Sequence, residues 1–252
     1  MRTVTVRNIT IGEGIPKICV PIVAHSKEEI LKEAGNLRQI PADLVEWRAD
    51  WFALDDPCAA VEVLAALREV LGDLPLLFTF RTKSEGGQKQ VRAEEYLALN
   101  EAAARSGYVD LIDAELFMGE ETVKSLIAAA HCCGVRVVAS NHDFVKTPEK
   151  EEIVRRLCAM QQLGADILKI AVMPQSRADV LTLLAATEEM QRCFANRPLI
   201  TMSMGGYGAV SRICGEVIGS AVTFGAAGKA SAPGQMPVQE LSQMLAALHR
   251  AV

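Results

Sequence analysis

The sequence contains little that would suit a membrane protein or a nucleic-acid-binding protein. Its longest apolar stretches, such as residues 125–139, are interrupted well before the roughly 20 residues that a membrane span needs. Lys and Arg number 26 against 31 Asp and Glu, which gives a formal charge of -5 and argues against a nucleic-acid or membrane partner. A small anionic substrate still fits this balance, because local arginines matter more than net charge.

Paired cysteine motifs and the pattern of a signal peptide are also missing from the sequence. The seven cysteines include no CxxC and no paired zinc spacing, and the adjacent Cys132 and Cys133 cannot easily share one metal. Their odd number fits reduced, mostly buried thiols. The N-terminal segment has no apolar run typical of a signal peptide. We therefore expect a cytoplasmic protein without a metal site.

The chain instead has a regular alternation of two hydrophobic patterns. Short β-rich runs start near residues 17, 44, 76, 109, 136, 166, 199 and 220. Stretches of helical periodicity cover residues 26–37, 58–71, 93–106, 120–133, 148–163, 176–193, 209–218 and 238–249. Ser26 with Glu29 forms a capping box at the start of the first of them. Strands that are apolar on both faces indicate a parallel sheet covered by helices.

Eight strand–helix units predict an α/β protein whose fold is a (β/α)8 TIM barrel, which is typically about 250 residues long. An open doubly wound sheet is the competing architecture, but eight units fill the 252 residues almost completely. Residues 3–12 alternate as two short strands around Arg7-Asn8, so we expect a β-hairpin within residues 1–15 that caps the N-terminal mouth of the barrel. No linker interrupts the chain, and we expect one domain over residues 1–252.

The run at residues 166–172 has one lysine, Lys169, in the middle of an apolar strand. A buried ammonium is costly unless it is paired or loses its proton. The neutral amine is a nucleophile that can form a Schiff base with a carbonyl. A lysine near a strand end often extends its head group to water instead, so the neighbouring residues must decide between these alternatives.

Polar side chains gather where the predicted strands end, and a (β/α)8 barrel carries its active site at that end. The residues concerned are Glu46, Arg48, Arg81, Asp113, Glu115, Asn141, His142 and Lys169, with Glu85 in the loop after the third strand and Arg212 at the start of a helical segment. Because a buried charge must be paired or functional to offset its desolvation, this concentration indicates an active site.

The residue types suggest imine chemistry. Lys169 is the candidate nucleophile toward a ketone, and His142 suits proton transfer near neutral pH. Glu85 is suited to hold that imidazole. Arginines near the lysine would favour its neutral form and could bind a carboxylate bidentately. The iminium supplies the electron sink, so this chemistry needs no metal and no organic cofactor.

Several of these residues have a structural alternative. Glu46 could orient an arginine for function, or form a purely structural ion pair with Arg48 on one strand face. We expect Asp113 and Glu115, two apart on one strand, to support the lysine or the arginines rather than to act as an acid–base pair. Met202, Met204 and Phe224 are expected to line the pocket or the core.

The glycines at 206 and 208, followed by Ser211, resemble part of a dinucleotide-binding fingerprint. The third glycine is missing, and no ribose-binding acid follows about 20 residues later. A phosphate site after the seventh and eighth strands of a barrel is the alternative use of these glycines.

The motifs together resemble one known family. The segments LVEWRADWF, LLFTFR, YVDLIDAELF, ASNHDF, LKIAVMP, ITMSMG and KASAPGQ, spread over residues 44–235, are similar to those of type I 3-dehydroquinate dehydratase of the shikimate pathway, which serves aromatic amino acid biosynthesis. SNHDF, LKIAVMP and KASAPGQ are highly specific, whereas EWR and FTFR are weaker alone. The resemblance implies a (β/α)8 barrel, a cytoplasmic homodimer and the dehydration of 3-dehydroquinate to 3-dehydroshikimate.

The resemblance also implies roles for individual residues. Lys169 would form the Schiff base with the C3 ketone, His142 would remove a C2 proton and help the C1 hydroxyl leave in a syn elimination, and Glu85 would position His142. The residues that would contact the substrate are Glu46, Arg48, Arg81, Arg212, Ser231 and Gln235. Among these, Arg212 would bind the carboxylate, and Ser231 and Gln235 belong to a loop that closes over the substrate.

One position departs from the family pattern. Pro21 stands at the end of the first barrel strand, where related chains often have serine, so a hydrogen bond to the substrate is lost or made by water. Two other functions are compatible with these residues. A Schiff-base aldolase would use the glycines near residue 206 for a phosphate, and a non-catalytic barrel would only bind a small acid.

Overall fold

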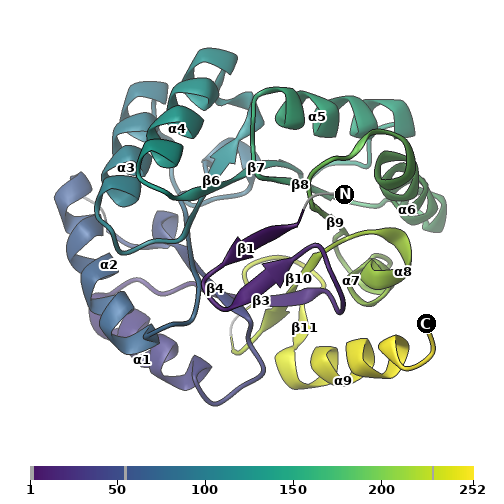
Figure 1. The fold of residues 1–252 in the computed structure, drawn as a ribbon, viewed down its shortest axis with the longest axis horizontal. Coiled ribbons are helices and arrows are strands. Elements are labelled where there is room, and N and C mark those ends of the chain that lie inside the picture. The colour runs from purple at the N-terminus through teal and green to yellow at the C-terminus, as the bar shows by residue number, and fades with distance from the viewer. Residues whose placement is uncertain (1–2, 54–55, 229) are drawn as a thin grey trace.

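The computed structural model describes residues 3–53, 56–228 and 230–252, and it places them in a barrel of parallel strands surrounded by helices (Figure 1). The barrel strands are β3 (Lys17–Ile22), β4 (Leu44–Arg48), β5 (Leu76–Thr79), β6 (Leu111–Glu115), β7 (Arg136–Asp143), β8 (Ile167–Val172), β9 (Leu199–Ser203) and β10 (Val222–Ala226). Each pairs in parallel with the next along the chain, except that a bridge between Leu199 and Ser220 joins β9 to the start of β10. β10 also pairs with β3, so the strands close into the predicted (β/α)8 barrel.

The helices between the strands form the outer layer of the barrel. They are α1 (Lys27–Leu37), α2 (Pro57–Leu71), α3 (Ala93–Arg105), α4 (Glu120–Cys132), α5 (Lys150–Gln162), α6 (Arg177–Glu189), α7 (Ala209–Ile213), α8 (Gly215–Ile218) and α9 (Val238–His249). The capping box expected at Ser26 is present, with the Ser26 side chain accepting the Glu29 N–H. A two-residue strand that the sequence did not indicate, β11 (Met236–Pro237), adds to β10 just before α9.

The alternation of strand residues creates two apolar layers. Val20 and Ile22 of β3 point outward and pack with the helices in the large cluster between sheet and helices. Cys19 on the same strand points inward, where it packs with Leu44 and Leu77 in a second cluster inside the barrel. Side chains on the two faces of a strand alternate with period two, so each strand contributes to both layers.

The hairpin expected near the N-terminus is confirmed. β1 (Val4–Val6) pairs antiparallel with β2 (Ile9–Ile11), and Arg7 adopts a left-handed conformation in the turn (φ 49°). Figure 1 shows the hairpin across the centre of the ring of strands. Its Val4, Val6 and Ile11 side chains belong to the inner cluster, beside the residues that begin the strands, so the hairpin covers the N-terminal end of the barrel.

Two predicted helices and one expectation about cysteine are corrected by the structure. The stretch 209–218 is two short helices rather than one, with Cys214 between α7 and α8, and a side chain at Gly215 would meet the Ser220 carbonyl and Pro16. The stretch 176–193 is α6 followed by a π-helical turn at Met190–Phe194. All seven cysteines are free thiols, but four are exposed and only Cys19 is buried, so the expectation of mostly buried thiols is wrong.

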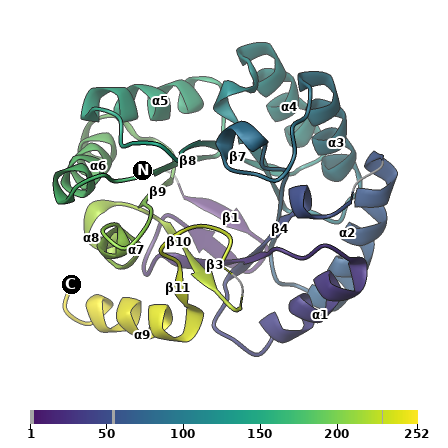
Figure 2. The same ribbon diagram turned by 180° about the vertical axis from the view of Figure 1, so that it is seen from behind.

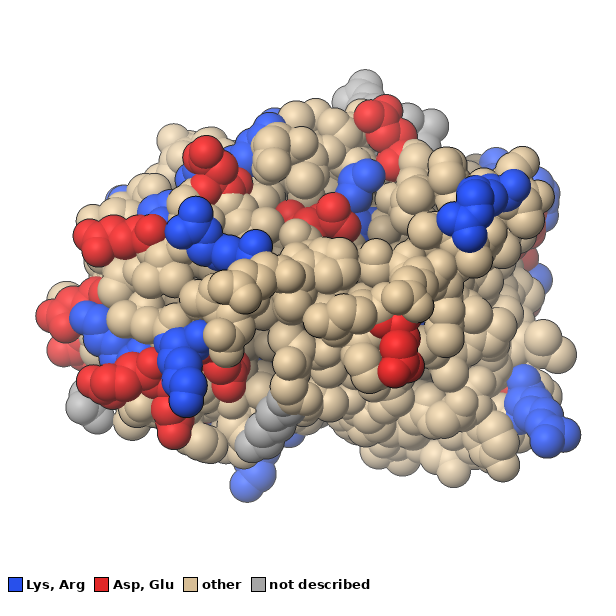
Figure 3. Space-filling model, turned by 90° about the horizontal axis from the view of Figure 1, so that it is seen from below, with Lys and Arg blue, Asp and Glu red and all other residues tan. Residues whose placement is uncertain are grey.

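The outer surface is unevenly charged. In Figure 3 the Lys, Arg, Asp and Glu side chains gather on the side where Figure 1 places α1 and α2, and they are sparse on the side of α9. Glu240 is the one residue of these four types within Val238–His249. Across the described part of the chain, no helix has both the length and the apolar character needed to cross a membrane.

Candidate active site

A cavity opens at the C-terminal ends of the barrel strands, the end opposite the hairpin and toward the viewer in Figure 2. It has about 420 Å³ of empty space. Its lining includes Glu46, Arg48, Arg81, Glu85, His142, Phe144, Lys169, Met202, Met204, Phe224, Ser231 and Gln235. The structure therefore brings together eight of the nine predicted site residues on this wall, and Arg212 lies directly behind it.

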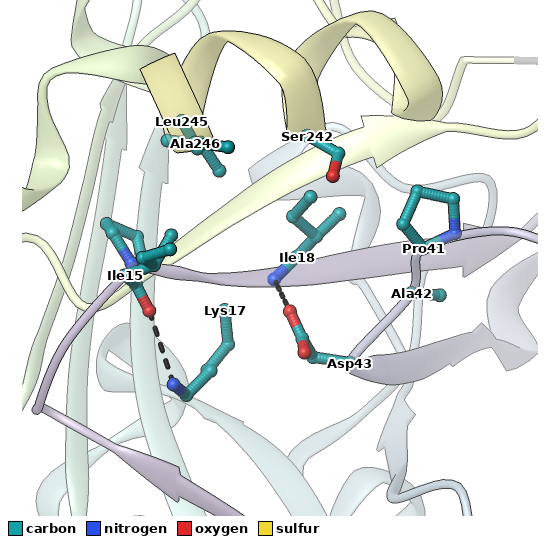
Figure 4. Close-up of a pocket in the computed structure, with 10 residues that line it drawn as sticks. Ile15, Lys17, Ile18, Pro41, Ala42, Asp43, Ser242, Leu245 and Ala246 are labelled. Atoms are coloured by element: carbon teal, nitrogen blue, oxygen red, sulfur yellow. Dashed lines mark hydrogen bonds between the residues drawn. The ribbon is translucent and has the colours of Figure 1, made fainter. Parts of the chain in front are cut away.

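A larger hollow, of about 790 Å³, lies at the other end of the strands, between α9 and the start of β3 (Figure 4). Its two charged side chains already bind backbone groups. Lys17 Nζ donates to the Ile15 carbonyl at 3.3 Å, and Asp43 accepts the Ile18 N–H at 2.7 Å. Residues at the N-terminal face of a barrel generally serve stability, and the lining of this hollow includes none of the nine predicted site residues. The candidate active site is therefore the smaller cavity.

Lys169 projects from β8 into the interior, and its side chain is only 4% exposed. Its amine nitrogen lies 3.5 Å from Glu46 Oε1 and 3.8 Å from Asp113 Oδ2, and 4.4 Å from the centre of the Phe224 ring. The residue does not extend to water. The nearest charged groups are carboxylates, so the arginines expected to surround the amine are not its closest neighbours.

Glu46 does not orient an arginine, contrary to one of the sequence-based alternatives, and Arg48 pairs elsewhere. Glu46 Oε1 accepts the Thr79 hydroxyl at 3.0 Å and faces the amine of Lys169. Arg48 makes a bidentate contact with Asp50, with Nε–Oδ1 and Nη2–Oδ2 distances of 2.8 and 2.9 Å. Because Asp50 is fully buried and binds Nε and Nη2 of the guanidinium, Arg48 is fixed at the cavity wall.

Arg81 is the centre of a buried ionic network. Its guanidinium lies 2.9 Å from Asp113 Oδ2, 2.9 Å from Glu115 Oε1 and 3.6 Å from Glu85 Oε2. It also donates to Ser140 Oγ at 3.0 Å. The supporting role expected for the two β6 carboxylates matches this geometry. Protein groups therefore bind most of the N–H groups of the guanidinium, and the ion pairs offset the cost of burying its charge.

His142 is held by Glu85 at two points. Glu85 Oε2 accepts the His142 backbone N–H at 2.8 Å and lies 2.9 Å from the ring atom Nδ1. The other oxygen, Oε1, accepts an N–H of the Asn141 side chain at 3.1 Å. His142 pairs in register with Ala171, two residues beyond Lys169 on β8, so both side chains reach the cavity from neighbouring strands.

The pKa values of this pair are displaced in opposite directions. Burial lowers the pKa of His142 well below 6.5, and the positive charges of Arg81, Lys169 and Arg48 lower it further. Burial raises the pKa of Glu85 to about 8, against the opposing influence of Arg81. Groups with displaced pKa values that share one cavity are typical of active sites. The pair can hold one proton near neutral pH and release it under mildly basic conditions.

Arg212, on α7, is a buried cation without an acidic partner in the described residues. Its side chain donates to the Pro233 carbonyl at 3.0 Å and approaches the Phe224 carbonyl at 3.5 Å, while Nε has no hydrogen-bond partner. Burial lowers its pKa to about 10. It contacts Met202 and Phe224, which line the cavity, from behind. Such an arginine is suited to bind an anion that enters from the cavity.

The loop at residues 225–235, of which residue 229 lies outside the described part, covers one side of the cavity. Ser231 and Gln235 bond to each other twice, through Ser231 N–H to Oε1 at 2.9 Å and Nε2 to Oγ at 3.0 Å. The Pro233 carbonyl also accepts the Gly205 N–H at 3.1 Å. The loop is therefore docked against the strand ends.

Sequence reasoning missed Asp50, Thr79 and Ser140, whose side chains hold Arg48, Glu46 and Arg81 in place. Asp50 follows Arg48 by two residues, and Thr79 and Ser140 stand near the ends of strands, so position alone could have suggested all three. The described residues contain no group of three or more His, Cys, Asp or Glu side chains arranged to hold a metal.

The sequence matches a known protein family over almost its whole length. The family model of type I 3-dehydroquinase matches residues 18–251. The 3-dehydroquinate dehydratases of Clostridioides difficile (strain 630) and Salmonella agona (strain SL483) are each 54% identical over all 252 residues of this chain, covering 99% and 100% of those proteins.

Solved structures agree with the sequence comparison. The Clostridium difficile enzyme, solved with covalently modified comenic acid, matches with a TM-score of 0.97 over 100% of this chain and 99% of that one, at 54% identity. 3-Dehydroquinate dehydratase from Geobacillus kaustophilus matches with a TM-score of 0.96 at 43% identity, over 99% and 97% of the two chains. With the barrel, the buried lysine and the glutamate–histidine pair in place, these matches show that the chain belongs to the type I 3-dehydroquinase family of enzymes.

Proposed function

We propose that this protein dehydrates 3-dehydroquinate to 3-dehydroshikimate through a Schiff base on Lys169, with His142 as the proton-transfer group. The observation that carries the proposal is one cavity that holds a buried amine and a glutamate-bound imidazole on neighbouring strands. A buried arginine without an acidic partner in the described residues lies behind it. Family membership supports the dehydration, and the covalently modified ligand reported for the Clostridium difficile enzyme supports a covalent step.

The ammonium of Lys169 first gives up its proton, and the neutral amine attacks the C3 ketone. The carbinolamine hydroxyl takes up that proton and leaves as water, which gives an iminium. His142 then takes a proton from C2, and the electron pair of the broken C–H bond moves into the iminium to form an enamine. The enamine electrons return and expel the C1 hydroxyl, which receives the proton from His142 and leaves as water. Because one imidazole serves both positions, the elimination is syn. Water finally hydrolyses the iminium and releases the free lysine.

The remaining residues bind and orient the substrate in this proposal. Arg212 receives the carboxylate, since its guanidinium has no acidic partner in the described part of the chain. The ring hydroxyls meet the wall formed by Glu46, Arg48 and Arg81, which are held by the contacts described above. Ser231 and Gln235 close the remaining side and exclude water from the imine.

The aldolase alternative finds less support at the loop after β9. A phosphate site there would need free backbone N–H groups. The Gly205 N–H already donates to Pro233 and the Ala209 N–H to Gly206, at 3.1 and 3.4 Å. A side chain at Gly208 would meet the Ser203 carbonyl, so its glycine is explained by this close approach.

Borohydride trapping tests the covalent step. Incubation with 3-dehydroquinate and borohydride should add the mass of one reduced ligand to the wild-type protein, on Lys169. Lys169→Met should give no adduct. Lys17→Met is the matched control, because Lys17 lies in the hollow at the opposite end of the barrel and its loss should leave trapping intact. An adduct of equal yield in Lys169→Met would refute the assignment.

We also propose that the chain works as a cytoplasmic homodimer formed from single-domain barrels, as the family resemblance implies. Sedimentation equilibrium should give twice the mass of the 27.2 kDa chain, and a monomer at all concentrations would contradict this. A single cooperative unfolding transition of the dimer is expected for one domain per chain.

A further inference from the structure

We infer that Arg156 and Asn141 are positioning residues that determine which nitrogen of His142 carries its proton. The inference rests on the proposed role of His142 as the proton-transfer group. Arg156 lies on α5, behind the wall of the cavity, and neither residue belongs to the lining of the cavity. Both act through Glu85.

A continuous chain of hydrogen bonds joins Arg156 to the imidazole. Arg156 Nη1 donates to Asn141 Oδ1 at 2.8 Å, and Asn141 Nδ2 donates to Glu85 Oε1 at 3.1 Å. Glu85 Oε2 then lies 2.9 Å from His142 Nδ1. Asn141 is 2% exposed, so water does not replace these partners easily. The chain links an outer helix to the proposed base through two intermediate side chains.

Arg156 determines the direction in which these hydrogen bonds are donated. A guanidinium only donates hydrogen bonds, so the asparagine atom that faces it must be the amide oxygen. The amide NH2 group is then forced to face Glu85 Oε1. Without the arginine, the amide could rotate and present its oxygen to Glu85 instead, which would favour a protonated Glu85. Arg156 therefore ensures that Glu85 receives a donor.

The donors on Glu85 determine the tautomer of His142. Oε1 accepts a hydrogen bond from the Asn141 amide, and Oε2 accepts one from the backbone N–H of His142. Each oxygen of the ionised carboxylate is therefore stabilised by a protein donor. An ionised Glu85 accepts a hydrogen bond from the Nδ1–H of the ring, so the ring carries its proton on Nδ1. The lone pair of Nε2 is then free to act as a base. A protonated Glu85 would donate to Nδ1 and leave the ring proton on Nε2, which then cannot act as a base. Since burial raises the pKa of Glu85 to about 8, the hydrogen bonds that it accepts decide how much of it is ionised at the working pH.

Arg156 is itself held by two further contacts besides Asn141. Its Nε donates to Glu152 Oε1 at 2.7 Å, and its guanidinium carbon lies 5.3 Å from the centre of the Phe117 ring. Its side chain is only 13% exposed. A carboxylate, an aromatic ring and a buried amide therefore hold the guanidinium together, whereas an exposed arginine usually has one weak partner or none.

The other charged groups around the pair do not set this direction. Glu115 and Asp113 from β6 oppose ionisation of Glu85, while Arg81 from the loop after β5 favours it. Positive charge at Arg81, Lys169 and Arg48 opposes protonation of His142. Asp143, next in the chain, is turned away and accepts the N–H groups of residues 145 and 146. From the side of α5, Arg156 acts on the pair through Asn141.

The test compares the pH dependence of kcat in Arg156→Met and in Arg155→Met. Arg155 is the matched control, since it lies on the same helix and binds the same Glu152 but is 65% exposed and makes no contact with Asn141. Both substitutions remove one positive charge. Arg156→Met should move the acid limb of the kcat profile to higher pH by about one unit, which is a tenfold change in the proton affinity of the pair. Arg155→Met should leave the limb in place.

Two further variants test the hydrogen bonds between Arg156, Asn141 and Glu85. Asn141→Leu removes the direct donor to Glu85 and should move the limb at least as far as Arg156→Met. Arg156→Lys keeps a donor-only group and should recover part of the shift. KM should change less than kcat in all of them, because none of these side chains lines the cavity.

Borohydride trapping separates this inference from the proposed function. Trapping on Lys169 should remain in the Arg156 variants, since the amine does not depend on the tautomer of His142, and it also shows that the variants are folded. A wild-type protein that is not trapped and not active refutes the proposed function. An active wild type whose Arg156→Met variant keeps the profile of Arg155→Met, or loses activity equally at every pH, refutes the positioning role.

Discussion

The amine of Lys169 on β8 lies 3.5 Å from Oε1 of Glu46 on β4, across the interior of the barrel. Asp113 on β6 lies 3.8 Å from the same amine. The lysine is thus held between carboxylates of two other strands, and its charge is balanced before any substrate arrives. In the proposed reaction the arriving ketone must compete with these two partners for the amine.

This arrangement predicts an energetic coupling between Lys169 and Glu46. Lys169→Met should lower the free energy of unfolding by about 2–4 kcal/mol, because Glu46 would be left as a buried carboxylate without its cation. Adding Glu46→Gln to Lys169→Met should recover at least about 1 kcal/mol of this loss. Urea unfolding of the two single variants and the double variant measures the coupling, and additive effects would show that the pair does not interact.

A second prediction concerns the stability of the protein between pH 6.5 and 8. The folded pKa of Glu85 is raised from 4.5 to about 8, so the folded protein holds a proton in this range that the unfolded chain has released. Its contribution to stability is complete below about pH 4.5 and is lost as pH rises through 8. The lowered pKa of His142 acts in the opposite direction, and its effect fades as pH rises above 6.5, the value of the unfolded chain.

Glu85 can be observed separately from His142 by comparing two proteins that share this histidine. The free energy of unfolding should fall by about 1–2 kcal/mol between pH 6.5 and 8 in the wild type. Glu85→Gln, which cannot ionise, should show a flatter curve. The difference between the two curves, from urea unfolding at each pH, is the measurement. Parallel curves would mean that Glu85 is already ionised at pH 6.5.

The positions of the main site residues could be predicted because strand patterns determine them. Residues 166–172 are apolar around Lys169, and any parallel barrel places the end of that strand beside the end of the strand that carries His142. The inward direction of Asp113 and Glu115 follows from their spacing of two residues. The hairpin at residues 3–12 was predictable for the same reason, from alternation around a turn.

The pairing of charges could not be predicted in the same way. The sequence does not show which partner each arginine takes: Arg48 is held by Asp50, Arg81 by three carboxylates and Arg212 by carbonyl groups. These differences depend on side-chain rotamers and on a short helical turn at Ala49–Trp51 that folds Asp50 back onto Arg48. Neither is encoded by hydrophobic periodicity.

A third prediction concerns Arg212. Arg212→Gln should raise KM strongly, by a factor equivalent to roughly 2–5 kcal/mol, if its guanidinium receives the substrate carboxylate. The same change should leave the unliganded protein as stable as the wild type or slightly more stable. Among the described residues no carboxylate would lose its partner, and a buried cation would be removed. Steady-state kinetics and urea unfolding measure the two effects, and an unchanged KM would remove Arg212 from the binding site.

Arg81 should behave in the opposite way, because it is the paired arginine. Arg81→Met would leave Asp113, Glu115 and Glu85 close together in the interior without their shared cation. Breaking a buried ion pair from one side costs about 3–5 kcal/mol. We therefore expect Arg81→Met to be far less stable than Arg212→Gln at pH 8, although both remove one buried positive charge.

The pH dependence of that loss tests its cause. Arg81 holds the pKa of Asp113 below 3.8 against the opposing effect of burial, so removing Arg81 allows the carboxylates to take up protons as pH falls. The gap in unfolding free energy between wild type and Arg81→Met should then narrow from pH 8 to pH 5, in urea unfolding followed at both pH values. A gap that stays constant would point to lost packing of the arginine side chain rather than to uncompensated charge, since packing does not depend on protonation.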